Sequence, residues 1–238
     1  MRNGSGERPV QLIQAAMAGA ALFFLSPLLG LISLLVILSS RGSVLHRARR
    51  TGFRGRTFVL LKFRTMVEGA HEQGPGVTGA GDPRITSIIG ALLRRTKVDE
   101  LPQLINVLRG DMRFVGPRPE DPRYLGYYSR DQLRLLDVLP GITSPASLQF
   151  IDEEALLVGD DVEREYVERV LPAKLDTELA ALDEWRSAGD ILVVARTLMR
   201  LARSSTHSAL GGLRTRSEPR GTQRLSEQRD TPRGRPDL

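Results

Sequence analysis

The sequence predicts an α+β fold that is mainly helical, with a small β element and an N-terminal helix that enters a membrane. Three patterns support this prediction: an uncharged apolar stretch over residues 15–38, apolar residues at helical spacing over residues 85–93 and 101–108, and a strand-like run at residues 58–61. A chain of 238 residues suits one globular domain with appendages. We place a membrane-anchoring segment at residues 1–43, a globular domain at 44–203 and a basic disordered tail at 204–238.

Composition narrows the class of protein. Hydrophobic residues make up 41% and charged residues 26% of the chain, which is ordinary globular usage and excludes a disordered or polytopic membrane protein. Cysteine is absent, so disulfides, thiolate zinc sites and cysteine nucleophiles are excluded together. The net charge of +6 favours polyanionic partners without choosing among nucleic acid, anionic lipid and phosphorylated small molecules.

The apolar N-terminal stretch carries no charged residue between Arg8 and Arg41. As a helix rising ~1.5 Å per residue it can reach through a hydrocarbon core of ~30 Å, and it is too long for the ~7–15 apolar residues of a signal peptide. Ser26 and Pro27 lie near its middle, and the proline predicts a kink because it lacks a backbone donor. A kinked spanning helix and a re-entrant hairpin are both compatible with these residues. The richer basic flank after the stretch places the globular part in the cytoplasm in either case.

The globular part begins with a predicted β-strand and continues with predicted helices. Residues 58–61 predict a strand that leads into residues 62–66, and glycines at 74–81 predict a loop. Helical spacing from Ile85 to Leu93 predicts a helix beginning just after Pro83, and spacing from Leu101 to Leu108 predicts a second helix starting near Asp99. The same spacing predicts further helices at residues 166–171 and 191–198. Arginines among Gly, Pro, Ser and Thr after Thr206 predict the disordered tail.

Asp99 and Glu100 are adjacent carboxylates at the head of the second predicted helix. Taken alone, they fit a helix N-terminus stabilised by the helix dipole. Cations close in sequence change that interpretation, since two carboxylates with several cations beside a helix N-terminus can hold a divalent ion and a diphosphate. The nearby cations are Arg94, Arg95, Lys97, Arg113 and Arg118.

Three cations, Arg118, Lys62 and Arg64, stand in restricted settings. Arg118 lies between Pro117 and Pro119, which hold it on a stiff, extended backbone. Lys62 and Arg64 alternate with an aromatic residue on the predicted strand, which places both cations on one face.

Read in order, seven motifs together resemble the bacterial sugar transferase family, the monotopic phosphoglycosyl transferases. The motifs are Lys62-Phe63-Arg64-Thr65-Met66, Asp82-Pro83-Arg84-Ile85-Thr86, Leu93-Arg94, Asp99-Glu100-Leu101-Pro102-Gln103-Leu104, Asn106-Val107-Leu108, Gly110-Asp111-Met112 and Val115-Gly116-Pro117-Arg118-Pro119. The resemblance runs from about Ala15 to Arg203 and is to the short form of the family, with one N-terminal membrane segment and no preceding multi-span domain.

The resemblance implies a two-step transfer. Asp99 would attack the sugar-bearing phosphate of a UDP-sugar, UMP would leave, and a polyprenyl (undecaprenyl) phosphate would take the sugar 1-phosphate from the aspartyl intermediate. Mg²⁺ would be held at Asp99 and Glu100. Substrate contacts are carried over to Lys62, Arg64, Arg84, Arg94 and Arg118. The reaction would start assembly of a bacterial surface glycan (exopolysaccharide, capsule, O-antigen or glycoprotein glycan) at the cytoplasmic face of the inner membrane.

The resemblance also favours the re-entrant helix, with its break at Ser26 and Pro27. Interfacial amphipathic helices would include residues 191–201, with Arg196, Arg200 and Arg203 toward anionic lipid.

Two departures from the family pattern leave the donor sugar open: Lys97 stands where a small polar residue is usual, and residues 140–147 follow the family's Pro-Gly-Leu-Thr-Gly only loosely. An inactive membrane adaptor and a lipid-phosphate hydrolase are the competing interpretations. The intact carboxylate pair argues against the adaptor, and the lack of interleaved aromatic and basic residues argues against nucleic acid as a partner.

Overall fold

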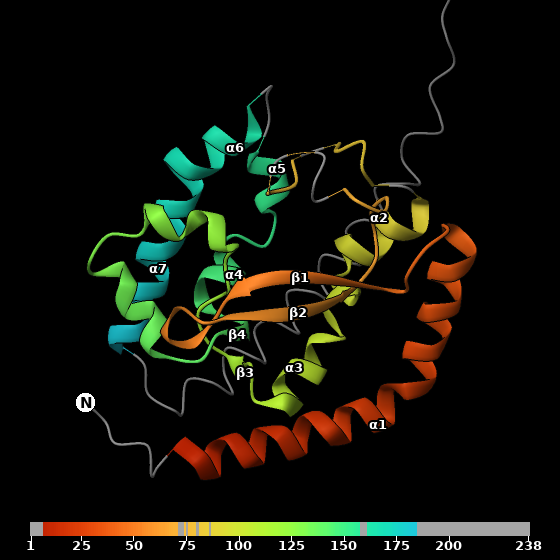
Figure 1. Ribbon diagram of the computed structural model, residues 1–238, viewed down its shortest axis with the longest axis horizontal. Helices are drawn as coiled ribbons and strands as arrows, with labels where there is room; N and C mark the ends of the chain where they lie inside the picture. Colours follow the sequence, from red (N-terminus) through yellow and green to blue (C-terminus); the bar gives the residue numbers. More distant parts are fainter. Residues whose placement is uncertain are drawn as a thin grey trace, which may run out of the picture.

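The computed structural model describes residues 7–184 apart from residues 71–73, 75, 80, 86 and 158–160. The described chain is mainly helical around two small sheets, which confirms the predicted fold class, and α1 runs along two sides of the body (Figure 1). The α-helices are α1 (Glu7–Ser39), α2 (Ile88–Arg95), α3 (Gln103–Arg109), α4 (Pro145–Gln149), α5 (Glu153–Leu156), α6 (Val162–Glu165) and α7 (Leu171–Glu184). Short 3₁₀ helices are η1 (Phe53–Gly55), η2 (Val98–Glu100), η3 (Pro122–Tyr127) and η4 (Gln132–Asp137), and η5 (Tyr166–Val170) is a π-helical turn. The helix expected at 191–198, with Arg196, Arg200 and Arg203, and the tail 204–238 lie outside the described residues.

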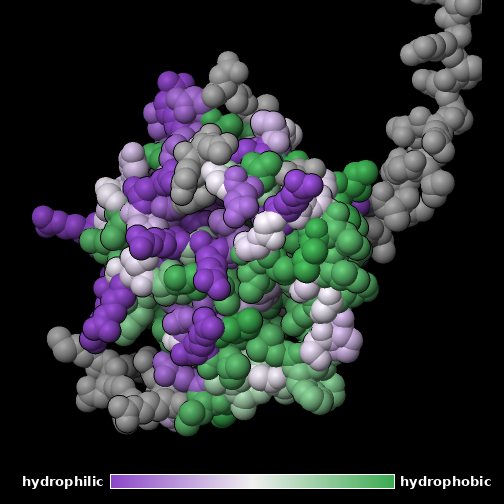
Figure 2. All heavy atoms as spheres, turned by 45° about the vertical axis from the view of Figure 1, so that its right-hand side comes forward, coloured by the Kyte–Doolittle hydropathy of each residue, from purple (hydrophilic) through white to green (hydrophobic). Residues whose placement is uncertain are grey.

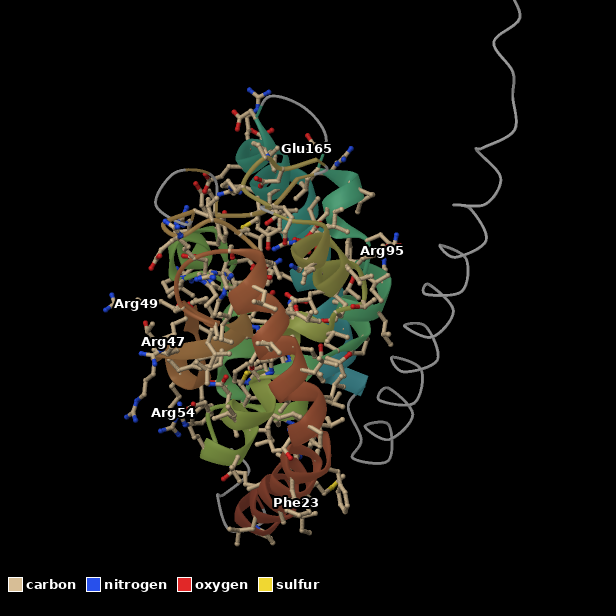
Figure 3. All side chains as sticks on the ribbon, turned by 90° about the vertical axis from the view of Figure 1, so that its right-hand side faces the viewer. Phe23, Arg47, Arg49, Arg54, Arg95 and Glu165 are labelled. Atoms are coloured by element: carbon tan, nitrogen blue, oxygen red, sulfur yellow. The ribbon has the colours of Figure 1, made fainter. Side chains whose placement is uncertain are left out.

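Helix α1 is bent rather than broken. By length and composition its segment Pro9–Ser39 could cross a membrane. Pro27 lies inside the helix and cannot donate to the carbonyl of Phe23, four residues earlier. The hydroxyl of Ser26 donates to that carbonyl at 2.7 Å, so the carbonyl keeps a partner. The expected break at Ser26 and Pro27 is therefore a bend within one continuous helix, and Phe23 lies near the corner between its two arms (Figure 3).

Both arms of α1 pack against the globular body. In the first arm, Ala18 is buried against α3, and the backbone N–H of Phe114 donates to Gln14 Oε1 at 3.0 Å. In the second arm, Ile32 and Val36 are buried against β2 and α2. A straight helix of 33 residues would be about 50 Å long and could not stay on the body at both ends. The bend therefore lets one helix serve as a scaffold along two sides of the domain.

The outer side of α1 is apolar. Phe23 and Phe24 are 75% and 78% exposed and stack edge to face. Ten further large apolar side chains of the helix are exposed: Val10, Leu12, Ile13, Met17, Leu28, Leu31, Leu34, Leu35, Ile37 and Leu38. Hydrophobic side chains gather over the side along which α1 runs (Figure 2). A continuous exposed apolar surface of this size is typical of a membrane or protein contact.

The first sheet pairs β1 (Leu45–Thr51) with β2 (Thr57–Phe63) in antiparallel register, with Ala48 opposite Leu60. The strand predicted at residues 58–61 is β2. Strand β1 was not predicted, because its arginines resemble the basic flank of a membrane segment. Arg47 and Arg49 alternate with buried Ala48 and point outward, as does Arg54 from the following turn (Figure 3).

The second sheet pairs β3 (Arg113–Val115) with β4 (Gly141–Thr143) in parallel. The two backbones approach closely, since a Cβ added to Gly141 would lie 2.1 Å from the nitrogen of Gly116. Gly116 N–H donates to Thr143 O, and Gly141 N–H donates to Pro117 O, each at 3.0 Å. This contact fixes the backbone that leads to Arg118.

The predicted helices exist with shifted starts. Helix α2 begins at Ile88 rather than just after Pro83, because Ile85 pairs with Met66 in a β-bridge and the Ser87 hydroxyl caps the helix. Asp99 and Glu100 lie on η2, one turn before α3 begins. The helical prediction at residues 166–171 is confirmed by η5 and the start of α7, which pack around a buried core cluster.

Candidate active site

The carboxylate pair is held by a short strained turn. Lys97, which precedes η2, has a left-handed backbone (φ 56°, ψ 15°), an uncommon conformation for a residue with a side chain. Val98 packs into the core cluster beneath α1, so the turn is anchored. The side chain of Asn106 in α3 accepts from Leu61 N–H at 3.0 Å and donates to Val59 O at 2.7 Å. These bonds lock α3 to β2 and bring Lys62 beside η2.

Glu100 is clamped between two cations. Lys62 Nζ lies 3.1 Å from Glu100 Oε1, and Arg118 donates to both carboxylate oxygens, with Nη1 3.2 Å from Oε2. Burial alone would raise the pKa of Glu100, but Arg118 and Lys62 hold that pKa well below its usual value. Burial lowers the pKa of Lys62 despite the opposing effect of Glu100. Glu100 is thus a permanent anion whose charge is already balanced.

Asp99 has the opposite environment. Its side chain is buried, and its Oδ1 accepts no hydrogen bond from the residues that the structure describes. Burial, together with the neighbouring charge of Glu100, raises the pKa of Asp99 to about 6. The ionised form still dominates at neutral pH. Asp99 therefore offers an ionised, desolvated oxygen that none of the described residues pairs.

A cavity of about 420 Å³ connects these groups. Its catalytic part contains Asp99, Glu100 and the cations Lys62, Arg94, Lys97 and Arg118. Its remaining wall includes Arg50, Glu120, Glu153, Glu154, Tyr166 and Lys174. The structure thus brings together the predicted carboxylates and three of the five predicted substrate contacts, and it also brings Lys97 into the site.

The other two predicted substrate contacts lie outside this lining. Arg64 Nη2 donates to the carbonyl and the hydroxyl of Ser40 at 2.8 and 3.0 Å and so holds the C-terminal end of α1. Arg84 forms an ion pair with Asp82 at 2.6 Å and donates to two carbonyls of the preceding loop. Both residues hold local structure next to the cavity.

Arg94 lines the cavity but is already engaged. Its guanidinium donates to Glu154 of α5 and lies 3.4 Å from the hydroxyl of Thr65. The adjacent Arg95 points outward, away from the body (Figure 3). A carboxylate therefore takes the position on Arg94 that a phosphate would need.

Sequence reasoning missed Glu120, Glu153, Glu154 and Lys174. These residues are spread over 55 positions and belong to none of the quoted motifs, so no local spacing connects them. Tyr166 was assigned only to an apolar helix face. In the structure its hydroxyl donates to Glu120 Oε2 at 2.8 Å inside the cavity wall.

The site fits a magnesium ion that is shared with a phosphorylated ligand better than a metal centre made of protein ligands alone. Among the described residues there is no cluster of three His, Cys, Asp or Glu side chains that could hold a metal. Asp99 Oδ1 is one free carboxylate ligand, whereas the oxygens of Glu100 are taken by cations. Mg²⁺ commonly keeps several waters and binds one or two carboxylates together with substrate phosphates. Such a donor set therefore fits Mg²⁺ only when a phosphorylated ligand completes it.

Comparison with known proteins identifies the family to which this chain belongs. The model of the family described as "Bacterial sugar transferase" matches residues 8–204. The chain is 36% identical over 197 residues to the UDP-glucose:undecaprenyl-phosphate glucose-1-phosphate transferase of Caulobacter vibrioides, covering 81% of this chain and 68% of that protein. It is 40% identical over 141 residues to the exopolysaccharide production protein ExoY of Rhizobium meliloti (53% and 62%), and 35% identical over 192 residues to the Escherichia coli UDP-glucose:undecaprenyl-phosphate glucose-1-phosphate transferase (77% and 38%). The match thus covers about two thirds or less of these relatives. Because the family match includes both the apolar helix and the carboxylate pair, the chain belongs to the bacterial sugar transferase family.

Proposed function

We propose that this enzyme transfers a sugar 1-phosphate from a UDP-sugar to undecaprenyl phosphate through a covalent intermediate on Asp99. The observation that carries the proposal is the buried carboxylate oxygen of Asp99, which no described residue pairs, in a cavity that also contains Lys62, Arg94, Lys97 and Arg118. The printed names of the Caulobacter and Escherichia relatives support the donor and acceptor classes.

In the first step, Asp99 Oδ1 attacks the phosphorus that bears the sugar. A new O–P bond forms and the bond from this phosphorus to the bridging oxygen of the diphosphate breaks. UMP leaves with that oxygen and its electron pair. Lys62 and Arg118 neutralise Glu100, which would otherwise repel the incoming diphosphate. Arg94 turns from Glu154 to a phosphate oxygen. Asp99, with Glu100 nearby, would hold Mg²⁺, and the ion would supply further charge neutralisation when bound.

In the second step, a phosphate oxygen of undecaprenyl phosphate attacks the same phosphorus. The Asp99 carboxylate is released as the leaving group, and the lipid carries away the sugar diphosphate. The exposed apolar side of α1 supports this acceptor, because it would hold the domain against the bilayer at the level where a lipid phosphate lies.

The same surface supports a location at the inner membrane of a bacterium with the catalytic domain on the cytoplasmic face, where UDP-sugars are made. The name of the Rhizobium relative supports a role in exopolysaccharide production.

The test uses detergent-solubilised protein with undecaprenyl phosphate, Mg²⁺ and a panel of UDP-sugars, and measures both UMP and the lipid product. Asp99→Asn keeps the shape of the side chain but removes the nucleophile, so we expect UMP release to fall to background. Asp131→Asn, at an exposed carboxylate outside the cavity, is the matched control and should keep full activity.

Three outcomes would count against parts of the proposal. UMP release by Asp99→Asn above a trace would refute the nucleophile. Formation of free sugar phosphate without lipid product would show a hydrolase instead of a transferase. Full activity in excess chelator would remove Mg²⁺ from the mechanism.

A further inference from the structure

Another part of the cavity lining contains a buried charged group made of Lys174, Glu120, Glu153 and Tyr166, which we call the Lys174 group. Lys174 Nζ lies 2.8 Å from Glu120 Oε1, 2.8 Å from Glu153 Oε2 and 3.2 Å from the Tyr166 hydroxyl. The Tyr166 hydroxyl in turn donates to Glu120 Oε2. Four side chains from three segments of the chain therefore meet at one ammonium group.

One oxygen of this group remains available to a ligand. Glu153 Oε1 accepts no hydrogen bond from any residue that the structure describes, and the Glu153 side chain is 25% exposed, against 6% for Lys174 and 10% for Glu120. Glu153 therefore presents the accessible edge of the group to the cavity, while the hydroxyl of Tyr166 orients Glu120.

The charge of the group decides what it can bind. Burial alone would lower the pKa of Lys174, but Glu120 and Glu153 raise that pKa, so the ammonium stays charged. The pKa of Glu120 is lowered by Lys174 against the effect of burial, so this carboxylate stays ionised. Two carboxylates around one ammonium give these side chains a net charge of −1, so they attract a phosphate less than the cations beside Asp99 do. The ammonium also fills the place between the carboxylates that a metal ion would need.

Hydroxyl groups suit this environment, since a carboxylate accepts their hydrogen bonds and an ammonium donates to their oxygens. The distance to the catalytic part is also suitable. Arg118 and Glu120 both line the cavity and are two residues apart on a proline-stiffened backbone, which corresponds to about 6–7 Å. A ring attached to a phosphate beside Arg118 would therefore reach Glu120 and Glu153.

From these contacts we infer that the Lys174 group binds the hydroxyls of the transferred sugar and discriminates between donor sugars, with Glu153 as the residue in contact. This inference rests on the proposed transferase function. It assigns the neutral, polyhydroxylated part of the donor to the carboxylate-rich wall and the diphosphate to the cationic wall of one cavity.

The test compares UDP-glucose with its 4-epimer UDP-galactose and uses UMP as an inhibitor that lacks the sugar. Glu153→Gln keeps the shape of the side chain and replaces the carboxylate of a partly exposed residue. We expect kcat/KM for the preferred donor to fall about tenfold or more, and the ratio between the two donors to shrink, because the variant loses a charged hydrogen bond to one hydroxyl. Inhibition by UMP should stay within about twofold of the unmodified protein.

Two further variants separate recognition from folding. Tyr166→Phe keeps the ring and removes the hydroxyl that orients Glu120, so it should shrink the donor ratio in the same direction but less. Glu168→Gln is the matched control: Glu168 is an exposed glutamate of η5 outside the cavity lining, and its replacement should leave the ratio unchanged.

The outcomes are distinguishable. An unmodified protein that releases no UMP from any UDP-sugar overturns the proposed function and this inference with it. An active protein whose donor ratio is unaffected by Glu153→Gln and Tyr166→Phe overturns the inference alone. UMP inhibition that weakens in parallel with kcat/KM would assign the group to the ribose and also overturn it.

Discussion

Arg94 and Glu154 form an ion pair inside the cavity that holds the nucleophile. Arg94 Nε lies 3.1 Å from Glu154 Oε1, and Arg94 Nη2 donates to the same oxygen. The adjacent Glu153 binds Lys174, so the short helix α5 connects the catalytic part of the cavity to the Lys174 group. In this structure a carboxylate thus takes the position on Arg94 that a phosphate would need.

Donor binding should improve when this internal anion is removed. Glu154→Gln abolishes the charge that competes with the diphosphate for Arg94. The pair is partly exposed, with side-chain exposures of 18% and 40%, so it is worth only about 0.2–1 kcal/mol. We expect the KM for the UDP-sugar to fall about two- to fivefold, as measured by UMP release. Glu168→Gln, at an exposed glutamate of η5, is the control, and an unchanged or higher KM in Glu154→Gln would contradict the competition.

The close contact between Gly141 and Gly116 should tolerate no side chain. A Cβ at Gly141 would lie 2.1 Å from a backbone nitrogen, so β3 and β4 would have to separate and lose the hydrogen bonds that fix the backbone before Arg118. We expect Gly141→Ala to destabilise the protein by several kcal/mol, of order 3 or more, and to abolish transfer. Gly126→Ala, where an added Cβ meets nothing within 4 Å, should behave like the unmodified protein in thermal unfolding. Equal melting temperatures for the two variants would refute the contact.

Glu178 should make the fold less stable as the pH rises. Burial raises the pKa of this carboxyl from 4.5 to about 7, although Ser144 and the backbone N–H of Arg118 donate to it. The native state therefore binds more protons than the unfolded state between these two pH values. Its free energy of unfolding should decrease by up to a few kcal/mol, on that order, between pH 4.5 and pH 7.

Replacing Glu178 with glutamine removes the carboxyl group that titrates. In Glu178→Gln the decline attributable to this residue should disappear, as measured by urea unfolding in detergent at pH 5, 6 and 7. Glu168→Gln serves again as the control that retains the decline. An identical pH dependence in Glu178→Gln and the unmodified protein would show that burial does not perturb this group.

The sequence predicted the parts of the site that local motifs encode and missed the parts that tertiary contacts create. Asp99, Glu100 and Arg118 belong to contiguous motifs, and the structure brings them together as expected. Arg64 shares such a motif but points to the end of α1, because a motif does not specify which neighbour a long side chain meets. Lys174 carries no local signal at all, since its charged partners Glu120 and Glu153 are distant in the sequence.

The same distinction applies to the secondary structure. Apolar periodicity located α2 and α3, but their starts depended on the bridge at Ile85 and the turn at Lys97, which are tertiary features. Strand β1 was hidden because an alternating row of arginines resembles the basic flank of a membrane segment.

The bend at Pro27 gives the last prediction, which concerns membrane topology. Both arms of α1 pack on one body, through Ala18 in the first arm and Ile32 in the second. If the domain is cytoplasmic, both ends of the helix must then lie on the cytoplasmic side. Single cysteines at Asn3, which precedes the described residues, and at Ser43 can test this in a chain that has no cysteine of its own.

We expect both cysteines to resist a membrane-impermeant thiol reagent added outside intact spheroplasts and to react once the membrane is opened. Pro27→Ala restores the N–H that Phe23 O lacks and relieves the clash, so a minority of molecules should straighten and label at Asn3 from outside. Gly30→Ala, where an added Cβ meets nothing within 4 Å, is the control in the same helix and should not change the labelling. External labelling at Asn3 in the otherwise unmodified protein would refute the re-entrant helix, because a spanning α1 cannot keep both arms on the domain, yet it would leave the chemistry proposed for Asp99 unaffected.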